Sequence, residues 1–247
     1  MKRLTIILIA LLAFLSSLGA QSIVPRPDSI TMRKGTFRLS GAAVKCDPAM
    51  DRISLEAVKR FSARIALLSG KSSSVSSPIG LSQAVAQGSA KGIIFLCDNS
   101  LQKEEYILDI SPSMALVKAG SLNGFQYALQ TLRQLLPASV YGTKAEGGEK
   151  FNLPCCFIKD KPRFAYRGMH LDCSRHFWSV EEIKRYLDVM AMFKLNRFHW
   201  HLTDDQGWRL EINSYPLLTQ KGAYREGTMI GKDFSSNDGV RYGGSYS

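Results

Sequence analysis

The chain has 247 residues, of which 45% are hydrophobic and 21% are charged. This composition excludes a disordered or fibrous protein, and the length suits one large domain or two modest ones. The net charge of +11 is spread along the sequence without a block of like charges, which argues against a nucleic-acid-binding arm. A basic surface in contact with water is the simpler interpretation.

Residues 1–20 have the pattern of an export signal. Lys2 and Arg3 precede an apolar stretch, Leu4–Leu15, and small residues follow as far as Ala20. The stretch is shorter than the roughly 20 apolar residues of a membrane-spanning helix, and an uncleaved anchor is the alternative interpretation. We therefore expect an exported protein, periplasmic or extracellular, with no stable membrane insertion after the signal is removed.

The cysteines show no paired spacing of the kind found in zinc knuckles. The sequence contains Cys46, Cys97, Cys155, Cys156 and Cys173, and an odd number does not specify a disulfide framework. Buried free thiols are the default interpretation. No glycine-rich phosphate-binding motif follows a predicted strand, so we expect no nucleotide and no other cofactor.

Residues 22–160 are predicted to form an α+β domain. Apolar residues at helical spacing indicate a helix over Ala57–Leu68, ending at Gly70. A second helix begins after Ser121 and stops before Pro137. Strands are expected at Gly92–Cys97, Tyr106–Ile110 and Met114–Lys118, and a serine-rich loop at Ser72–Ser77. Nothing in this region has the pattern of a catalytic site.

Residues 164–247 have a different pattern, that of a strand, a helix and a second strand. Two strands are predicted there, Gly168–Ser174 and Arg197–Leu202. Between them Ser179 and Glu182 have the spacing of a capping box that begins an amphipathic helix. A strand, a helix and a strand in about 35 residues make a βαβ unit, so the two strands are expected to be parallel.

The ends of these two strands concentrate the residues capable of chemistry. Arg175 follows the first strand, and Asp204 follows the second. Functional groups of α/β barrels lie where strands end, so a guanidinium and a carboxylate are expected to face one pocket, with Trp208 as an apolar platform. The planar guanidinium of Arg175 suits vicinal hydroxyls or a carboxylate, and a surface ion pair is the alternative.

Two histidines on the second strand allow more than one interpretation. His199 and His201 point to the same face because strand side chains alternate. Together with Asp204 they are compatible with a metal-dependent hydrolase, but hydrogen-bonded polar side chains filling a barrel interior are the simpler interpretation, so we expect no metal. Asp204 and Asp205 are adjacent on extended backbone and point in opposite directions, so we do not expect them to share a substrate atom.

Two long motifs resemble glycoside hydrolase family 20, the β-N-acetylhexosaminidases. Tyr166–Phe177 (YRGMHLDCSRHF) is similar to the opening barrel strand of the family, and Phe198–Arg209 (FHWHLTDDQGWR) is similar to its second strand and loop. Asp160–Arg163 and Arg241–Gly244 also match the family pattern. The region before the motifs is similar to the family's non-catalytic domain, with Ile23–Pro27 resembling its usual first strand.

The resemblance implies a fold and a mechanism. The fold is an α+β N-terminal accessory domain followed by the start of a (β/α)8 TIM barrel, which is incomplete here. The mechanism is exo-acting and retaining: the acetamido oxygen of a terminal amino sugar is the nucleophile, and a consecutive Asp-Glu pair orients it and protonates the leaving oxygen. By similarity, Arg175 binds the sugar's 3- and 4-hydroxyls, Asp204 belongs to a relay that supports the acid, and His201 assists it. The implied partners are amino-sugar glycans.

The sequence also departs from the family pattern. It contains no Asp-Glu dipeptide, and no histidine follows His201. About 80 residues follow Gly168, whereas a complete barrel takes about 250. We therefore expect the catalytic pair to lie beyond Ser247, the partial barrel to be poorly stable and this chain to be inactive alone. A secreted carbohydrate-binding module that uses Arg175, Trp200 and Trp208 without catalysis is the alternative.

Overall fold

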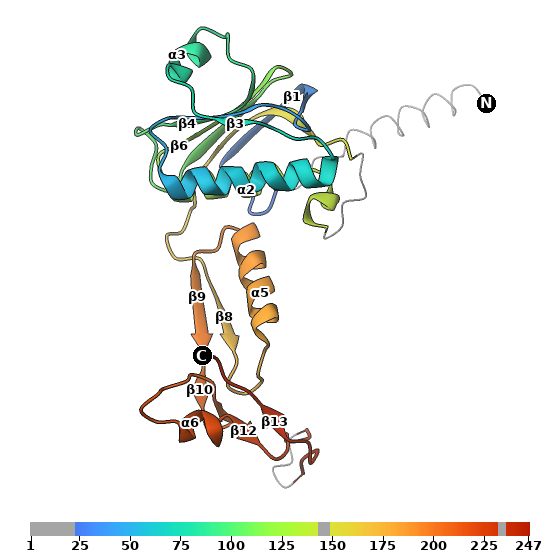
Figure 1. Ribbon diagram of the computed structural model, residues 1–247, viewed down its shortest axis with the longest axis vertical. Helices are drawn as coiled ribbons and strands as arrows, with labels where there is room; N and C mark the ends of the chain where they lie inside the picture. The colour runs from blue at the N-terminus through green and yellow to red at the C-terminus, as the bar shows by residue number, and fades with distance from the viewer. Residues whose placement is uncertain (1–22, 143–148, 232–235) are drawn as a thin grey trace, which may run out of the picture. The chain divides into compact units, whose positions relative to one another are not determined.

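The computed structural model describes residues 23–142, 149–231 and 236–247, so the predicted export signal, residues 1–20, lies outside the described residues. The chain divides into two compact units (Figure 1), the first ending at Arg163 and the second running from Phe164 to Ser247. Among the described residues, no helix combines the length and apolar character needed to cross a membrane.

The first unit is built on a seven-stranded mixed sheet with the strand order β1-β7-β5-β6-β4-β2-β3. The strands are β1 (Ser29–Arg38), β2 (Val44–Cys46), β3 (Val75–Ser76), β4 (Gly92–Cys97), β5 (Tyr106–Ile110), β6 (Met114–Ala119) and β7 (Asn152–Asp160). Neighbours from β1 to β6 pair antiparallel, and neighbours from β6 to β3 pair parallel. The unit is therefore an α+β domain, as the sequence predicts.

The helices of the first unit pack on both faces of the sheet and form a hydrophobic cluster on each face. They are α2 (Arg52–Ser69), α3 (Leu81–Ala86), α4 (Leu122–Gln134) and the short 3-10 helix η1 (Ala138–Tyr141). Side chains of α2 and α4 pack with Ile93 and Phe95 of β4 in the main hydrophobic core, whereas Leu81 of α3 packs with Ile94 and Leu96 in a smaller cluster. Alternation along β4 therefore places one helical layer on each face of the sheet.

Local sequence explains both ends of α2. The Asp51 carboxylate accepts hydrogen bonds from the Ile53 and Ser54 N–H groups at 2.9 Å, which satisfies two donors that have no partner within the helix. Gly70 ends the helix with a φ of 66°, a left-handed conformation that glycine adopts without a steric penalty. The predicted end of the helix at Gly70 is confirmed.

Some predictions for the first unit are wrong. The segment Ile23–Pro27 is not a strand, and the first strand begins at Ser29. Two prolines in that segment lack the N–H that a strand ladder needs. The predicted loop Ser72–Ser77 contains β3, which extends the parallel side of the sheet by pairing with β2. The strands β1, β2 and β7 were not predicted at all.

The second unit begins with a βαβ unit. Its elements are β8 (Gly168–Asp172), α5 (Val180–Met192) and β9 (Arg197–His201). The two strands are parallel, with Gly168 opposite Arg197 and Asp172 opposite His201. Ser179 and Glu182 form the predicted capping box. The βαβ prediction is confirmed, with strands that end one or two residues earlier than predicted.

Short elements follow the βαβ unit. They are β10 (Thr203–Asp204), β11 (Gly207–Trp208), α6 (Leu217–Gln220), β12 (Tyr224–Arg225) and β13 (Tyr242–Gly243). β10 and β11 form an antiparallel hairpin, and β12 pairs antiparallel with β13. The loop after β9 is therefore organised by hairpins.

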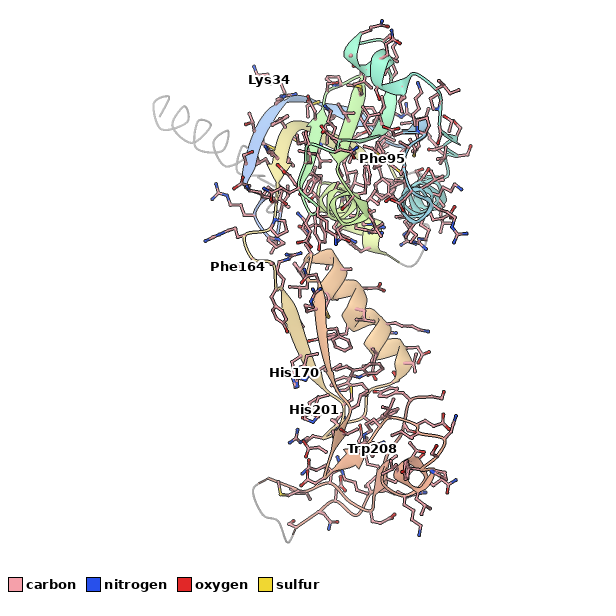
Figure 2. The ribbon with its side chains drawn as sticks, turned by 90° about the vertical axis from the view of Figure 1, so that its left-hand side faces the viewer. Lys34, Phe95, Phe164, His170, His201 and Trp208 are labelled. Carbon is pink, nitrogen blue, oxygen red and sulfur yellow. The ribbon has the colours of Figure 1, made fainter. Side chains whose placement is uncertain are left out.

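The two faces of β8 and β9 differ in character. Leu171 and Phe198 pack with Ile183 of α5 in a small hydrophobic cluster. On the face pointing away from α5, the His170 ring centroid lies 4.7 Å from that of His199 and 5.7 Å from that of His201 (Figure 2). This agrees with the prediction that His199 and His201 share a face.

All five cysteines are free thiols, and four are buried, with Cys97 half-buried. Burial raises the pKa of the Cys46 and Cys156 thiols to about 11, so both stay protonated at neutral pH. The prediction of buried free thiols is confirmed for four of the five.

Candidate functional site

Arg175 lies three residues beyond the end of β8, where the chain leaves the sheet. The Asp172 carboxylate begins this turn, because its Oδ1 accepts hydrogen bonds from the backbone N–H groups of Ser174 at 2.9 Å and Arg175 at 3.0 Å. A short side chain that bonds the backbone two and three residues later is a common way to turn a chain. The position of Arg175 is thus fixed by the last residue of the strand.

The Arg175 guanidinium makes three polar contacts through its three nitrogens. Its Nη1 lies 2.9 Å from Asp172 Oδ2, its Nη2 lies 2.8 Å from Asp204 Oδ2, and its Nε donates to Gln206 Oε1 at 2.9 Å. The side chain is nevertheless 50% exposed. Of its five N–H groups, two donate to nothing among the described residues. The guanidinium is therefore oriented by the protein and still open to a ligand.

Asp204 lies in the β10–β11 hairpin that follows β9. The backbone N–H of Asp205 donates to Asp204 Oδ1 at 2.9 Å. This hydrogen bond, with the nearby charge of Arg175, outweighs partial desolvation and lowers the pKa of Asp204 below its usual range. Asp204 is therefore an ionised partner for Arg175 at neutral pH, and the predicted meeting of a guanidinium and a carboxylate at the strand ends is observed.

Asp172 is ionised for related reasons. Desolvation raises its pKa, but the hydrogen bonds and the charge of Arg175 outweigh that effect, so the net shift is downward. His201 completes the group, because its Nε2 lies 3.1 Å from Asp204 Oδ2 and 3.2 Å from the Thr203 carbonyl oxygen. One oxygen of Asp204 is thus shared by the guanidinium and the imidazole.

A metal-dependent hydrolase needs a set of side chains that can bind the metal ion, and the part of the chain that the structure describes contains no such set. There, no three His, Cys, Asp or Glu side chains are placed to hold one ion. The His199 ring packs edge-on against His170 at 4.7 Å, and Asp204 is engaged by Arg175 and His201.

The two tryptophans of the alternative carbohydrate-binding site, Trp200 and Trp208, have different surroundings. Trp200 stacks on Phe198 with ring centroids 5.8 Å apart, and its indole N–H donates to Cys173 Sγ at 3.1 Å. This places Trp200 on the α5 side of the strands, opposite to the histidines. Trp208 donates its indole N–H to the Leu210 carbonyl at 2.6 Å. Strand alternation directs the Trp200 ring away from the histidine face, so its position does not favour the carbohydrate-binding alternative.

The same strands and loops are matched by two protein-family models. The model described as glycosyl hydrolase family 20, domain 2, matches residues 20–161, and the model of that family's catalytic domain matches residues 164–247. The chain belongs to glycosyl hydrolase family 20. Its fold is the domain 2 of that family followed by the start of the catalytic domain.

Individual family 20 proteins resemble the chain over nearly all its length. It is 37% identical over 227 residues to a beta-hexosaminidase of Porphyromonas gingivalis, covering 91% of this chain and 27% of that relative. An exo beta-N-acetylglucosaminidase from Vibrio harveyi, solved with N-acetylglucosamine, matches with a TM-score of 0.71 and 36% identity, covering 92% of this chain and 32% of that structure. An N-acetyl-beta-hexosaminidase from Streptomyces plicatus matches with a TM-score of 0.72 and 30% identity, covering 91% of this chain and 40% of that structure.

Sequence reasoning missed Arg209, the last residue of the second family 20 motif. Its side chain is fully buried and donates to backbone carbonyls only: Nε to Cys173 at 2.9 Å, Nη2 to Ser174 at 2.8 Å and Nη1 to Ala223 and Gly244. Burial, and then the charge of Arg225, lowers its pKa. The sequence offers one hint of a buried charge here, because the charged Arg209 directly follows the aromatic Trp208 at the end of the motif.

Proposed function

We propose that this family 20 chain belongs to an exo-acting β-N-acetylhexosaminidase, which removes terminal β-linked N-acetylglucosamine or N-acetylgalactosamine from amino-sugar glycans. The observation that carries the proposal is the half-exposed guanidinium of Arg175, held between the carboxylates of Asp172 and Asp204. It lies at the carboxyl ends of parallel strands, where α/β barrels bind their ligands. The Vibrio harveyi relative is bound to N-acetylglucosamine, an amino sugar of this class.

In this proposal each site residue has a distinct task. The N–H groups of Arg175 donate to the oxygens of the sugar's vicinal 3- and 4-hydroxyls, a geometry that a planar guanidinium suits. Asp204 keeps the guanidinium in place and, with His201, forms the relay that supports the catalytic acid. Asp172 contacts the other terminal nitrogen of the guanidinium, so Arg175 is held between two carboxylates.

The reaction itself is retaining and substrate-assisted. The acetamido oxygen attacks the anomeric carbon, the leaving oxygen takes a proton from an acid, and water then opens the cyclic intermediate with retention of configuration. The family resemblance assigns orientation and protonation to an Asp-Glu pair, which these 247 residues do not contain. We therefore propose that this chain alone does not turn over substrate.

Two measurements test the proposal. A chromogenic N-acetylglucosaminide assay on the purified chain is expected to show no release; turnover lost in Arg175→Ala and kept in the exposed control Arg197→Ala contradicts the inactivity. Reading the coding DNA beyond the Ser247 codon tests the wider activity. An in-frame Gly-Gly-Asp-Glu segment supports a hexosaminidase, whereas an immediate stop codon together with sugar binding favours the non-catalytic module.

We also propose that residues 1–20 direct export to the periplasm or the cell exterior. The support is the charged and then apolar pattern from Lys2 to Leu15. Sequencing the mature N-terminus from culture tests this: a chain that begins at Gln21 supports export with cleavage, and one that retains Met1 contradicts cleavage and favours the uncleaved anchor.

A further inference from the structure

Three consecutive backbone carbonyls at the candidate site are each held by an arginine from later in the chain. Arg209 donates to Cys173 at 2.9 Å and to Ser174 at 2.8 Å. Arg225 donates through Nη1 to the carbonyl of Arg175 itself at 2.8 Å. The backbone carbonyls of Cys173, Ser174 and Arg175 thus accept hydrogen bonds from the guanidiniums of Arg209 and Arg225.

These contacts lie just beyond the point where the hydrogen-bonded pairing of β8 with β9 ends. The last residue of β8 paired with β9 is Asp172, and beyond it the Cys173 N–H still donates to His201 at 2.9 Å. A backbone carbonyl needs a hydrogen-bond partner, and its direction sets the adjoining backbone torsions. A carbonyl held at Arg175 therefore fixes the direction in which the Arg175 side chain leaves the backbone.

Arg225 is itself well anchored for this task. Its guanidinium carbon lies 4.9 Å from the Tyr242 ring centroid, and its Nε and Nη2 each lie 3.1 Å from Thr228 Oγ1. The Tyr242 hydroxyl donates to the Phe177 carbonyl at 2.7 Å, and its ring centroid lies 4.8 Å from that of His176. The β12–β13 pair thus contacts each of the residues from Arg175 to Phe177.

We propose that Arg225 is a positioning residue for Arg175, which it holds in the orientation that receives the vicinal hydroxyls of an amino sugar. The proposal rests on the sugar-binding function proposed for Arg175. Arg225 does not touch the sugar; it acts by removing the freedom of the backbone from which Arg175 extends. Affinity gained in this way comes from preorganisation, because the ordering cost is met before the ligand arrives.

The chain offers a matched control, Arg241, directly before β13. Arg241 lies over the Tyr224 ring at 4.6 Å and pairs with the exposed Glu226 at 3.5 Å. It repeats the arginine–tyrosine stacking of Arg225 and Tyr242 without the bond to Arg175. Replacing either arginine by methionine removes one guanidinium and one stacking contact. A difference between the two variants therefore reports the hydrogen bonds of Arg225 to Thr228 and to the Arg175 carbonyl, which Arg241 lacks.

The test is solvent exchange of arginine Nε–H groups, measured by NMR on the nitrogen-15-labelled 247-residue chain. The Arg175 signal is assigned by its loss in Arg175→Lys, and the Arg209 signal serves as an internal reference for the integrity of the unit. We expect Arg225→Met to accelerate Arg175 exchange about 3- to 10-fold, the equivalent of one hydrogen bond, while Arg209 stays within about 2-fold. Arg241→Met leaves both unchanged.

Several outcomes overturn the proposal. They are an unprotected Arg175 signal in the unaltered chain, no acceleration in Arg225→Met, or equal acceleration at Arg175 and Arg209, which indicates general destabilisation. If Arg225→Met does not fold, Arg225→Gln, a shorter polar side chain, decides by the same comparison. A parallel titration with N-acetylglucosamine separates the two proposals: selective acceleration at Arg175 without any sugar-induced shift there retains the positioning role and contradicts the sugar-binding role.

Discussion

The two units of this chain are stabilised by different kinds of interaction. Among the described residues, the main core of the first unit contains 31 buried hydrophobic residues, whereas the hydrophobic cluster of the second contains three: Cys173, Ile183 and Tyr246. In the second unit a fully buried arginine, Arg209, bonds four backbone carbonyls. The first unit depends on apolar burial, and the second on directional polar contacts.

This difference separates stability from ligand contact. Apolar burial is large and non-directional, so it stabilises the first unit without orienting any one polar group. Hydrogen bonds contribute less to stability but fix orientation, which is what a site such as Arg175 requires. The second unit also exposes apolar side chains of α5, including Leu187 and Val189 at 41% and 49%. It is expected to be the less stable of the two.

The largest effect is expected from Phe95→Ala in the first unit. Phe95 is fully buried, with its ring centroid 6.3 Å from that of Phe125, so its removal leaves a cavity in the main core. Such a truncation lowers the free energy of unfolding by about 3–5 kcal/mol. Urea denaturation followed by far-ultraviolet circular dichroism measures the loss. Ile79→Ala is the control, because Ile79 is 98% exposed; an equal effect at the two positions contradicts the described core.

A smaller effect, confined to the second unit, is expected from Arg209→Met. Buried carbonyls lose their donor, at a cost of about 2–4 kcal/mol. Trp178, Trp200 and Trp208 are the three tryptophans of the chain and all lie in the second unit, so their fluorescence reports on that unit alone. The denaturation midpoint by fluorescence is expected to fall more than in Arg197→Met, whose side chain bonds the neighbouring Asn196 carbonyl. Equal midpoints in the two variants weaken the comparison between the units.

The smallest effect is a dependence on pH. The folded-state pKa values of Asp172 and Asp204 lie below their usual range, so their ionised forms stabilise the second unit above the unfolded pKa of about 4. This contribution is lost as the pH falls through the folded pKa values. Acid titration by tryptophan fluorescence is expected to show the transition at a higher pH in Arg175→Met than in Arg197→Met. Coincident transitions contradict the assigned role of Arg175.

The sequence predicted those elements whose signal is local. β4 and β5 have the predicted bounds, because each is a short run rich in apolar, β-branched or aromatic residues, which is typical of a strand. The capping box at Ser179 and Glu182 is equally local. By contrast, β1 is mostly exposed, carries a polar sequence and pairs with β7, more than a hundred residues away. Its strand state depends on that distant partner, so its own residues do not reveal it.

The contacts of the candidate site also fall into two groups, those that the sequence predicts and those that depend on distant residues. The meeting of Arg175 and Asp204 follows from the rule that neighbouring parallel strands end at one edge. The contact of Gln206 with Arg175 and the carbonyl bonds of Arg209 and Arg225 arise from how loops fold back on the strand end. Loop geometry of this kind depends on residues spread from Cys173 to Gly244, and no spacing pattern encodes it.

The acceptor set of Arg209 has a consequence for the order of events during synthesis. Two of its acceptors, Cys173 and Ser174, precede it in the chain, and the other two, Ala223 and Gly244, follow it. A growing chain therefore cannot complete this set until Gly244 has left the ribosome. Contacts between distant segments form slowly because loop closure precedes the gain in energy. The strand end that carries Arg175 is thus expected to become rigid late, after the first unit has already folded.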